Sequence, residues 1–513
     1  MNNFYICRVS AFQARGNQID IPKTVATSFF CIPLHIIEAE GNVEVALCHA
    51  SDLRNFINLE IQTATNIRWS VKLNSFLAEN GDKLEEGDFL LFEKIGRAFS
   101  VQCLKDNDKL YEPLFELLGK DEKHMMLTSA QSFSPSSLLS YKYLDIITAA
   151  KTKPFILLAG ISGTGKSRIV RELARACWDE GSEEYKAQKP QNFEMIQVKP
   201  NWHDSTELLG YVSRVSGKPV YVMGDFLRFI TKAWENIDVP HFLCLDEMNL
   251  APVEQYLAEY LSVVESRKLR DGKVVTDAIL KKCSEQWFFD LTAQLTEDEE
   301  LRNQFNNEGI ALPPNLIVVG TVNMDETTFS FSRKVLDRAM TIEMNEVNLW
   351  GGLDSKYERI GKLSGDMLIG KAVEGVDVYA DNKEVCDIAL KYLESVNEIL
   401  DMTPFKVAYR TRNEFLLYVV NNLPYTKDEN GTEYSQENVI ATALDEITSM
   451  KILSRIEGDD TKVPRTLLNG LKHCIEAQLL AITGEDDKIE SVSLAKLDEM
   501  LKRLESGYTS FWS

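Results

Sequence analysis

The stretch Phe155-Ile-Leu-Leu-Ala-Gly-Ile-Ser-Gly-Thr-Gly-Lys-Ser167 decides the fold of this chain. An apolar run ends in a glycine-rich turn, and the residues after Lys166 have the composition of a helix. The spacing is that of the G-x-x-x-x-G-K-[ST] phosphate loop, in which backbone N–H groups and a helix N-terminus surround a polyphosphate. We expect Lys166 to contact the β- and γ-phosphates and the Ser167 hydroxyl to ligate Mg²⁺. The predicted nucleotide-binding residues of the loop are Gly160, Ser162, Gly163, Thr164, Gly165, Lys166 and Ser167.

Two later apolar segments end in polar residues that suit the same site. His241-Phe-Leu-Cys-Leu-Asp-Glu247 ends in two carboxylates. We expect Asp246 to hold Mg²⁺ through water and Glu247 to polarise the attacking water. Leu316-Ile-Val-Val-Gly-Thr-Val-Asn323 ends in an asparagine that can orient this water beside the γ-phosphate. A turn-forming residue is the alternative interpretation of Asn323.

Two arginines follow the third strand, in Phe331-Ser-Arg-Lys-Val-Leu-Asp-Arg-Ala339. An arginine here can project from one subunit into the nucleotide of its neighbour and stabilise charge in the transition state. We assign this role to Arg338, whereas a solvated helix face explains Arg333 equally well. The catalytic residues predicted from the sequence are therefore Glu247, Asn323 and Arg338.

Composition limits the class and the compartment of the protein. A chain of 513 residues suffices for about two to four domains, and 44% hydrophobic with 26% charged residues is ordinary for a globular protein. No apolar run approaches the roughly 18 residues that span a bilayer, and Met1–Ser10 lacks the pattern of a signal peptide. Nine dispersed cysteines without a C-x-x-C pair fit reduced thiols, so we expect a cytoplasmic protein without a membrane partner.

The charge distribution directs any DNA contact to the N-terminal part. The net charge is −22, which argues against a chain that coats nucleic acid along its whole length. Residues 1–105 hold ten basic and twelve acidic residues and carry −2, which leaves −20 on the rest of the chain. A DNA ligand is therefore expected near the N-terminus.

Secondary-structure patterns divide the chain. Short β-branched and aromatic runs predict strands at Asn3–Val9, Asn42–Leu47, Trp69–Leu73, Phe89–Glu93 and Phe99–Leu104. The serine-rich residues 128–137 have the composition of a linker. Strand-like and helical segments then alternate to about residue 343, which predicts a parallel α/β sheet. Helices are predicted beyond it at Glu384–Leu400, Asn413–Asn422, Glu437–Leu453 and Leu494–Glu505.

Together, the phosphate loop and the two strands that end in Glu247 and Asn323 resemble the AAA+ family. Further segments resemble its McrB-like, dynein-related branch: Trp202–Tyr211 (WHDSTELLGY), Leu245–Tyr256 (LDEMNLAPVEQY), Leu261–Arg267 (LSVVESR), Ala408–Phe415 (AYRTRNEF) and Lys451–Gly458 (KILSRIEG). The resemblance covers about residues 140–480. It implies that Arg410 is the lid arginine that contacts the γ-phosphate.

One departure from this branch leaves the base of the nucleotide open. Familiar McrB proteins carry Asn-Thr-Ala-Asp after the third strand and prefer GTP, whereas this chain has Asn323-Met-Asp-Glu326. The expected cofactors are therefore Mg²⁺ with ATP or GTP.

Three N-terminal segments resemble the B-three DNA-binding pseudobarrel, which is known from plant transcription factors and from specificity domains of some restriction enzymes. They are Asp20–Lys23 (DIPK), Arg68–Leu73 (RWSVKL) and Lys83–Glu93 (KLEEGDFLLFE). Within them, Gly87-Asp88 is expected to make a tight turn before a core strand, and Trp69 is expected to pack in the core.

In that fold, arms projecting from the barrel grip DNA, and Arg8–Gln18 would be the first arm. Arginine can contact guanine edges or phosphates. The candidate DNA contacts are therefore Arg8, Arg15 and Arg68, each with a plain surface charge as the alternative.

A nuclease site is not expected in this module. Asp88, Glu93 and Lys94 superficially resemble a metal-dependent nuclease triad. However, Glu93 and Lys94 are adjacent, whereas alternating positions would place both on one face of a strand. The turn also explains Asp88.

The resemblances imply a B-three-like pseudobarrel at residues 1–108, a linker at 109–140, an AAA+ α/β NTPase domain at 141–345 and an α-helical lid at 346–513. They imply the motor and DNA-recognition subunit of a McrBC-like restriction or phage-defence system. Such a subunit would bind double-stranded DNA, form a ring, expected to be hexameric, and work with a separate McrC-like endonuclease. Two alternatives stay open: an AAA+ protein remodeller with an N-terminal adaptor, and a nucleotide-dependent DNA-binding regulator that recruits no nuclease.

Overall fold

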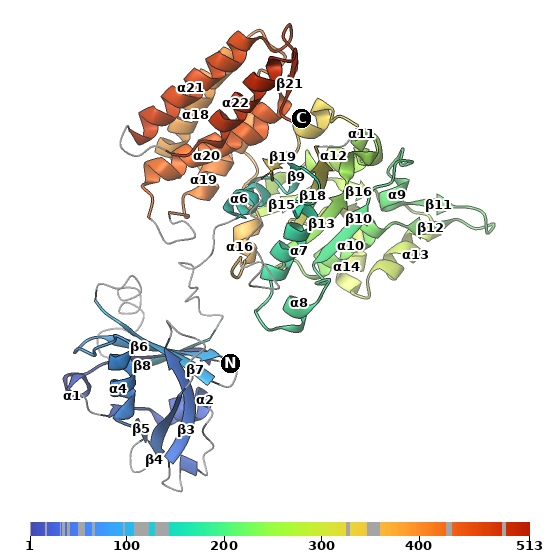
Figure 1. Ribbon diagram of the computed structural model, residues 1–513. Coiled ribbons are helices and arrows are strands. Elements are labelled where there is room, and N and C mark those ends of the chain that lie inside the picture. The colour runs from blue at the N-terminus through green and yellow to red at the C-terminus, as the bar shows by residue number, and fades with distance from the viewer. Residues whose placement is uncertain are drawn as a thin grey trace. The chain divides into compact units, whose positions relative to one another are not determined.

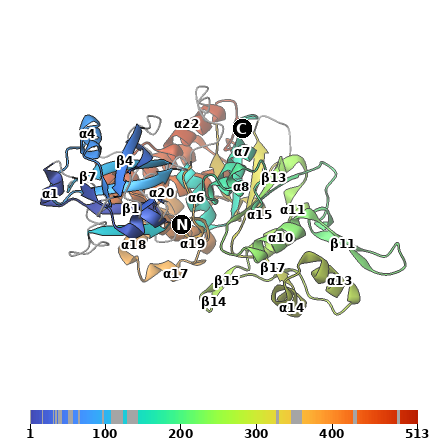
Figure 2. The same ribbon diagram turned by 90° about the horizontal axis from the view of Figure 1, so that it is seen from below.

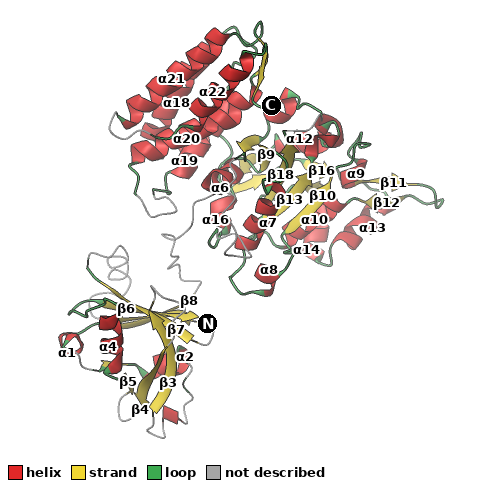
Figure 3. Ribbon diagram, in the orientation of Figure 1, coloured by secondary structure: helices red, strands yellow, loops and turns green. Residues whose placement is uncertain are grey.

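The computed structural model describes residues 2–15, 18–30, 32, 36–37, 42–49, 57–63, 67–95, 98–106, 123–128, 143–324, 329–345, 360–426, 433–484 and 489–512. The chain forms two compact units, Met1–Ser136 and Ser137–Ser513 (Figure 1). The first is rich in strands, and the second combines a parallel sheet with a helical bundle (Figure 3). The predicted fold class is confirmed: a β-rich N-terminal part, a central parallel α/β domain and a helical C-terminal part.

One mixed sheet, of order β2-β5-β4-β3-β7-β6-β1-β8, forms the first unit. Its strands are β1 (Asn2–Arg8), β2 (Ile19–Asp20), β3 (Asn42–His49), β4 (Ile57–Thr63), β5 (Ile67–Trp69), β6 (Phe89–Ile95), β7 (Ala98–Leu104) and β8 (His124–Thr128). Neighbouring strands are antiparallel, except that β3 and β7 pair in parallel. Because β8 pairs with β1, residues from the stretch expected to be a linker complete the sheet.

Aromatic side chains fill the core of this unit. Trp69 is fully buried and stacks on Phe92 with ring centroids 5.8 Å apart, which confirms its expected place in the core. Gly87 has a φ of 98°, a left-handed conformation that glycine adopts at little cost, and it makes the expected turn before β6.

Short helices accompany the sheet: α1 (Ala11–Ala14), α2 (Lys23–Ser28) and α4 (Lys72–Glu79). The predicted strand Trp69–Leu73 is wrong beyond Trp69, because α4 begins at Lys72. This helix buries Leu73, Phe76 and Leu77, which share one face at a spacing of three to four residues.

A parallel sheet of order β10-β13-β18-β9-β19 organises the second unit. Its strands are β9 (Phe155–Gly160), β10 (Phe193–Gln197), β13 (His241–Asp246), β18 (Leu316–Asn323) and β19 (Met340–Glu343). The central strands are almost wholly apolar, as expected where helices cover both faces. On β9, Ile156 and Leu158 enter a core shared with the C-terminal helices, whereas Phe155 and Leu157 enter a second core on the opposite face.

Helices and small antiparallel strand pairs surround this sheet. The helices are α6 (Leu144–Thr152), α7 (Lys166–Ala176), α8 (Glu183–Lys186), α9 (Thr206–Leu209), α10 (Asp225–Glu235), α11 (Val253–Tyr256), α12 (Ala258–Val264), α13 (Gln286–Leu295), α14 (Glu299–Glu308), α15 (Arg333–Leu336), α16 (Gly365–Leu368) and α17 (Val376–Tyr379). The antiparallel pairs are β11 (Gly210–Ser213) with β12 (Val220–Met223), β14 (Lys268–Arg270) with β15 (Lys273–Val275), and β16 (Ala278–Leu280) with β17 (Ile310–Ala311). Figures 1 and 2 both show the tip of the β11–β12 hairpin extending away from the sheet.

Residues 383–512 form a helical region that we call the lid. It contains α18 (Lys383–Ile399), α19 (Tyr409–Asn422), α20 (Gln436–Lys451), α21 (Arg465–Thr483), α22 (Val492–Leu504) and the strand pair β20 (Glu457–Asp459) with β21 (Tyr508–Ser510). Its apolar residues share one core with a face of the parallel sheet, so lid and sheet pack as one body. No helix among the described residues is both long and apolar enough to cross a membrane.

Candidate nucleotide site

The phosphate loop joins β9 to α7, as the motif predicts. Gly163 and Gly165 have φ values of 86° and 88°, which other residues rarely adopt, and no described atom beyond their chain neighbours lies within 4 Å of an added Cβ. Lys166 is 6% exposed, and its ammonium group donates hydrogen bonds to the carbonyl oxygens of Gly160 (3.0 Å) and Ile161 (2.7 Å). The loop is therefore open on its outer side and is backed by a buried cation.

Hydrogen bonds join the loop to the carboxyl ends of β13 and β18. The Ser167 hydroxyl donates to Asp246 Oδ1 (2.5 Å), which also accepts from the Thr321 hydroxyl (2.9 Å). Thr321 Oγ1 accepts in turn from the backbone N–H of Glu247 (3.0 Å). The Asn323 amide donates to Glu247 Oε1 (3.3 Å). The structure thus brings together Ser167, Asp246, Glu247 and Asn323 from three separate segments.

Glu247 has a left-handed backbone, with φ 52° and ψ 51°. This conformation is uncommon for residues other than glycine and costs on the order of 1–3 kcal/mol. It turns the chain sharply between the end of β13 and the short 3₁₀ helix Met248–Leu250, and the bond from the Glu247 N–H to Thr321 holds it there. Such strain gathers at functional sites, where the surrounding structure maintains it.

The chemistry of these groups suits a magnesium–nucleotide complex. Mg²⁺ prefers oxygen ligands and is commonly bound by one or two protein groups together with substrate phosphates. Ser167 Oγ and Asp246 Oδ1 lie 2.5 Å apart beside the loop and would hold the ion. Among the described residues, no group of three or more His, Cys, Asp and Glu side chains is arranged to hold a metal ion.

The predicted arginines lie at the opposite end of β9. Lys153, two residues before β9, donates to Glu265 Oε1 (3.2 Å). The same carboxylate pairs with Arg410, and it lies 3.9 Å from Arg338 Nε. We call Lys153, Glu265, Arg338 and Arg410 the arginine cluster.

The arginine cluster and the phosphate loop are separated by the length of β9. The cluster lies before the first residue of this strand, whereas the loop follows its last residue. A strand advances about 3.3 Å per residue, so the six residues of β9 span roughly 17 Å. The structure therefore does not bring Arg338 or Arg410 to the phosphate loop of their own chain.

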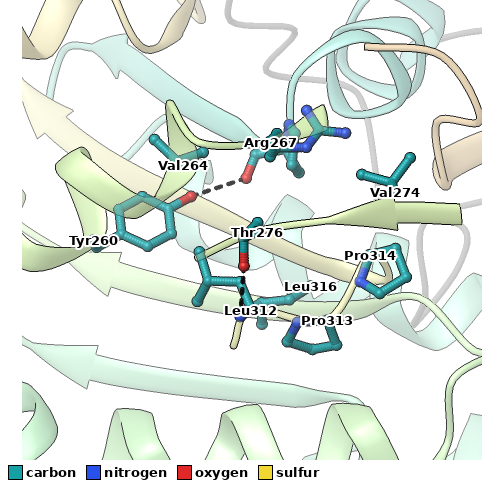
Figure 4. Close-up of a pocket in the computed structure, with 10 residues that line it drawn as sticks. Tyr260, Val264, Arg267, Val274, Thr276, Leu312, Pro313, Pro314 and Leu316 are labelled. Carbon is teal, nitrogen blue, oxygen red and sulfur yellow. Dashed lines mark hydrogen bonds between the residues drawn. The ribbon is translucent and has the colours of Figure 1, made fainter. Parts of the chain in front are cut away.

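Two cavities lie on the side of the arginine cluster. The larger, of about 290 Å³, opens between α12 and α19 and is lined by Lys153, Glu265 and Arg410 among others. The smaller, of about 10 Å³, lies among Tyr260, Thr276 and neighbouring apolar side chains (Figure 4). Its volume corresponds to about one water molecule, so the smaller cavity is no ligand site.

The candidate DNA contacts lie in the first unit. Arg15 is exposed and directly follows α1. Arg8, the last residue of β1, holds its guanidinium group 5.9 Å from the ring centroid of Phe89. Arg68 pairs with Asp20 at 2.7 Å, so a carboxylate already offsets its charge.

Asp88, considered above as part of a nuclease triad, has a structural role in the first unit. It is 5% exposed, accepts from the backbone N–H of Glu85 (2.6 Å) and pairs with Lys105 (2.6 Å). These contacts fix the turn from Glu85 to Asp88, which contains Gly87.

Thr321 is a site residue that the sequence analysis did not single out. It is 2% exposed, and its hydroxyl contacts both Asp246 and Glu247. A signal was present, because side chains alternate along a strand and Thr321 therefore shares a face of β18 with Asn323. A polar residue two positions before the predicted water-orienting asparagine points to the same site.

Replacing Thr321 by valine should lower nucleotide turnover about ten- to hundredfold, the usual effect of removing a group that orients a metal ligand. Valine keeps the shape of the side chain, but Asp246 loses a donor and the Glu247 N–H loses its acceptor. Phosphate release measured across a Mg²⁺ titration tests this. Thr341→Val is the matched control, because Thr341 is 1% exposed and its hydroxyl has no hydrogen-bond partner in the described part of the chain. Equal rates for the two variants would contradict the role given to Thr321.

Comparison with known proteins agrees with this geometry. Residues 155–340 match the AAA domain family (dynein-related subfamily), and residues 368–508 match a domain of unknown function (DUF8727). No curated protein matches the chain. Among solved structures, the chain is similar to the N-terminal domain of Helicobacter pylori LlaJI.R1, with 20% identity over 25% of this chain and 98% of that chain and a TM-score of 0.21. The chain thus contains a dynein-related AAA domain, and such domains hydrolyse nucleotide, generally with Mg²⁺.

Proposed function

We propose that this chain is the nucleotide-hydrolysing AAA+ motor and the DNA-recognition subunit of a McrBC-like restriction system. The proposed nucleotide hydrolysis rests on one observation, the hydrogen-bonded array of Ser167, Asp246 and Glu247 beside the phosphate loop. Thr321 and Asn323 hold this array from β18. The order of the motifs between residues 155 and 458 supports the McrB-like branch.

In the proposed reaction, Glu247 accepts a proton from the water that attacks the γ-phosphorus, and the bond to the β–γ bridging oxygen breaks. Asn323, which bonds to Glu247, holds that water in line. Lys166 stabilises the charge on the β- and γ-phosphates, and Ser167 and Asp246 would hold the Mg²⁺ ion that offsets part of this charge. These groups contact phosphates and water but not the base, so both ATP and GTP remain compatible.

The position of the arginine cluster supports a ring. AAA proteins typically form oligomers. Because the length of β9 separates Arg338 from the phosphate loop of its own chain, a second copy would have to offer the nucleotide that this arginine contacts. Arg410 lies in the same cluster and would reach the γ-phosphate of that same neighbour. We therefore propose a closed ring, hexameric by resemblance, in which Arg338 acts in trans.

The N-terminal unit supplies the proposed contact with double-stranded DNA. Residues 1–105 carry a net charge of only −2, against −20 on the rest of the chain, so a polyanion is repelled least there. Phe12 on α1 is 67% exposed and Arg15 follows it, which suits an arm that meets a partner. A separate McrC-like endonuclease would cut the DNA.

Residues 1–136, which include β8 and therefore complete the sheet, should bind duplex DNA at low salt and lose affinity as salt rises. Each phosphate contact that a variant loses should reduce the log–log salt slope by about 0.9. Arg15→Ala or Arg8→Ala should weaken binding by about 1–3 kcal/mol if the side chain reads a base. Arg68→Ala should weaken it less, because Asp20 already offsets this charge. Fluorescence anisotropy with modified and unmodified duplexes at several salt concentrations measures these effects.

Lys23→Ala is the control for this experiment, because Lys23 is an exposed cation on α2 outside the proposed arm. If the folded unit binds no duplex at low salt, the protein-remodeller alternative replaces the proposal. If it binds DNA but the full chain recruits no nuclease, the chain is a DNA-binding regulator.

A further inference from the structure

The lid holds the turn that presents Arg338. Lys451, the last residue of α20, is 1% exposed, and its ammonium group donates to the carbonyl oxygens of Leu336 (3.4 Å), Asp337 (3.1 Å) and Ala339 (2.8 Å). Arg455 adds an ion pair to the Asp337 carboxylate (3.1 Å). Both cations belong to the segment Lys451–Gly458, to which the proposed reaction assigns no role.

A buried network of charged side chains keeps Lys451 in place. Glu414 of α19 is 4% exposed and pairs with Lys451 (2.8 Å) and with Lys153 (2.6 Å). Burial would raise the pKa of Glu414, but the two lysines hold this pKa below its usual value. Burial lowers the pKa of Lys451 to about 8, while the Glu414 carboxylate acts in the opposite direction. Lys153 also bonds to Glu265, and Glu265 lies beside Arg338. The network of charges therefore extends from Lys451 to Arg338.

Stability alone gives no reason for a lysine at this position. A buried ion pair is often no more stabilising than well-packed apolar residues of the same volume, because both charges lose their hydration. What an apolar residue lacks is directed hydrogen bonds. The three bonds from Lys451 fix the backbone on both sides of Arg338, and this is a matter of geometry rather than of packing.

The lid also reaches the other end of β19, next to the phosphate loop. Lys496 of α22 is 4% exposed and pairs with Glu343 (2.7 Å), the last residue of β19. Asn345 donates to Glu343 and accepts from the backbone N–H of Ile161 (3.0 Å), the first residue after β9. The turn that carries Arg338 therefore precedes β19, and a contact with the phosphate loop follows it. A buried lysine of the lid bonds at each end of this strand: Lys451 at the start and Lys496 at the end.

The two lid helices that carry these lysines are tied together. Asp445 of α20 accepts from the Ser491 hydroxyl (2.6 Å) and from the Val492 N–H (2.7 Å) at the start of α22. We propose that Lys451 is a positioning residue for Arg338, by which the lid holds in place the arginine that is offered to a neighbouring copy. This inference rests on the proposed trans role of Arg338.

Lys451→Met tests the proposal, because methionine removes the charge while Glu414 keeps Lys153 as a partner. The full-length variant should bind nucleotide as the wild type does, but its turnover should fall about a hundredfold, which is the usual effect of misplacing a catalytic group by about 1 Å. Lys472→Met is the matched control, because Lys472 is a partly exposed lid lysine that pairs with Asp498. It should turn over at the wild-type rate.

Mixed assemblies locate the defect. A Lys451→Met copy keeps its phosphate loop, and a Lys166→Ala copy keeps a well-placed Arg338, so mixing these two should restore turnover. Mixing Lys451→Met with Arg338→Ala should restore none, because neither copy presents a working arginine. Rescue in this second mixture, or none in the first, would overturn the positioning role.

Two outcomes separate this inference from the proposed function. If Arg338→Ala is rescued by Lys166→Ala but Lys451→Met is not, only the positioning role fails. If neither is rescued, the trans role of Arg338 fails first. If Lys451→Met does not fold, Arg455→Gln provides a second test, because it removes only the ion pair with Asp337. This variant should lose less turnover than Lys451→Met and show the same pattern of rescue. Wild-type turnover by Arg455→Gln would then overturn the proposal.

Discussion

Replacing Glu247 by glutamine should lower turnover by about two to four orders of magnitude and leave nucleotide binding intact, because glutamine cannot accept the proton of the attacking water. The change is small in every other respect. Glutamine has the same size, its amide oxygen can still accept from Asn323, and the backbone N–H that bonds to Thr321 is untouched. The left-handed conformation of residue 247 therefore persists, and the loss reports chemistry rather than folding.

Two further variants serve as controls for this experiment. Glu254→Gln, at an exposed carboxylate on α11 seven positions further along, should hydrolyse nucleotide at the wild-type rate. Lys166→Ala should lose binding itself, because it removes the cation beneath the phosphate loop. Binding is measured with a fluorescent nucleotide and turnover by phosphate release. Hydrolysis by Glu247→Gln at the rate of Glu254→Gln would exclude Glu247 as the base.

The convergence of residues at the candidate nucleotide site was predictable from sequence because each contributing segment has a local signal. The strand predicted at Leu316–Asn323 has the same bounds in the structure, and the strand before Asp246 also forms as expected. In a parallel sheet the carboxyl ends of all strands meet at one edge, so residues that follow separate strands converge. Here Asn323 pairs in register with Gly160, which brings the third strand directly to the phosphate loop.

The N-terminal unit was harder to predict because short apolar runs suit two periods. Trp69, Val71 and Leu73 alternate like a strand, yet Leu73, Phe76 and Leu77 also recur at helical spacing, and the helix prevails from Lys72 onwards. The strand β8 has no such internal signal, and its pairing with β1 lies more than a hundred residues away along the chain.

The arginine cluster depends on contacts that no local pattern encodes. Lys451 bonds to carbonyl groups that precede it by 112 to 115 residues, and any lysine at the end of a helix has the same local sequence character. The resemblance implied that Arg410 contacts a γ-phosphate, but it carried no information on which copy supplies the phosphate. Arg410 pairs with Glu265, which also pairs with Lys153 just before β9, and this position favours a phosphate from a neighbouring copy.

Arg338→Ala should lower turnover about a thousandfold or more if Arg338 acts as an arginine finger on the nucleotide of a neighbouring copy. The turn that carries it precedes β19, and Met340, the first residue of β19, pairs with Ile156 near the start of β9. The side chain is 22% exposed and lies 3.9 Å from Glu265, so it can exchange this carboxylate for a phosphate without moving the strand. Wild-type turnover per subunit should accordingly rise with protein concentration as rings assemble.

Mixing variants distinguishes this role from a defect within one copy. Arg338→Ala copies keep an intact phosphate loop, and Lys166→Ala copies keep an intact arginine, so one interface in a mixed ring has both. Turnover should therefore reappear when the two inactive variants are combined. Arg333→Ala is the control: this guanidinium bonds to the Pro404 carbonyl (2.7 Å) and lies outside the arginine cluster, so its loss should cost less. Mass measurement would show whether the rings contain both variants. If such mixed rings stay inactive at every mixing ratio, Arg338 does not act across the interface.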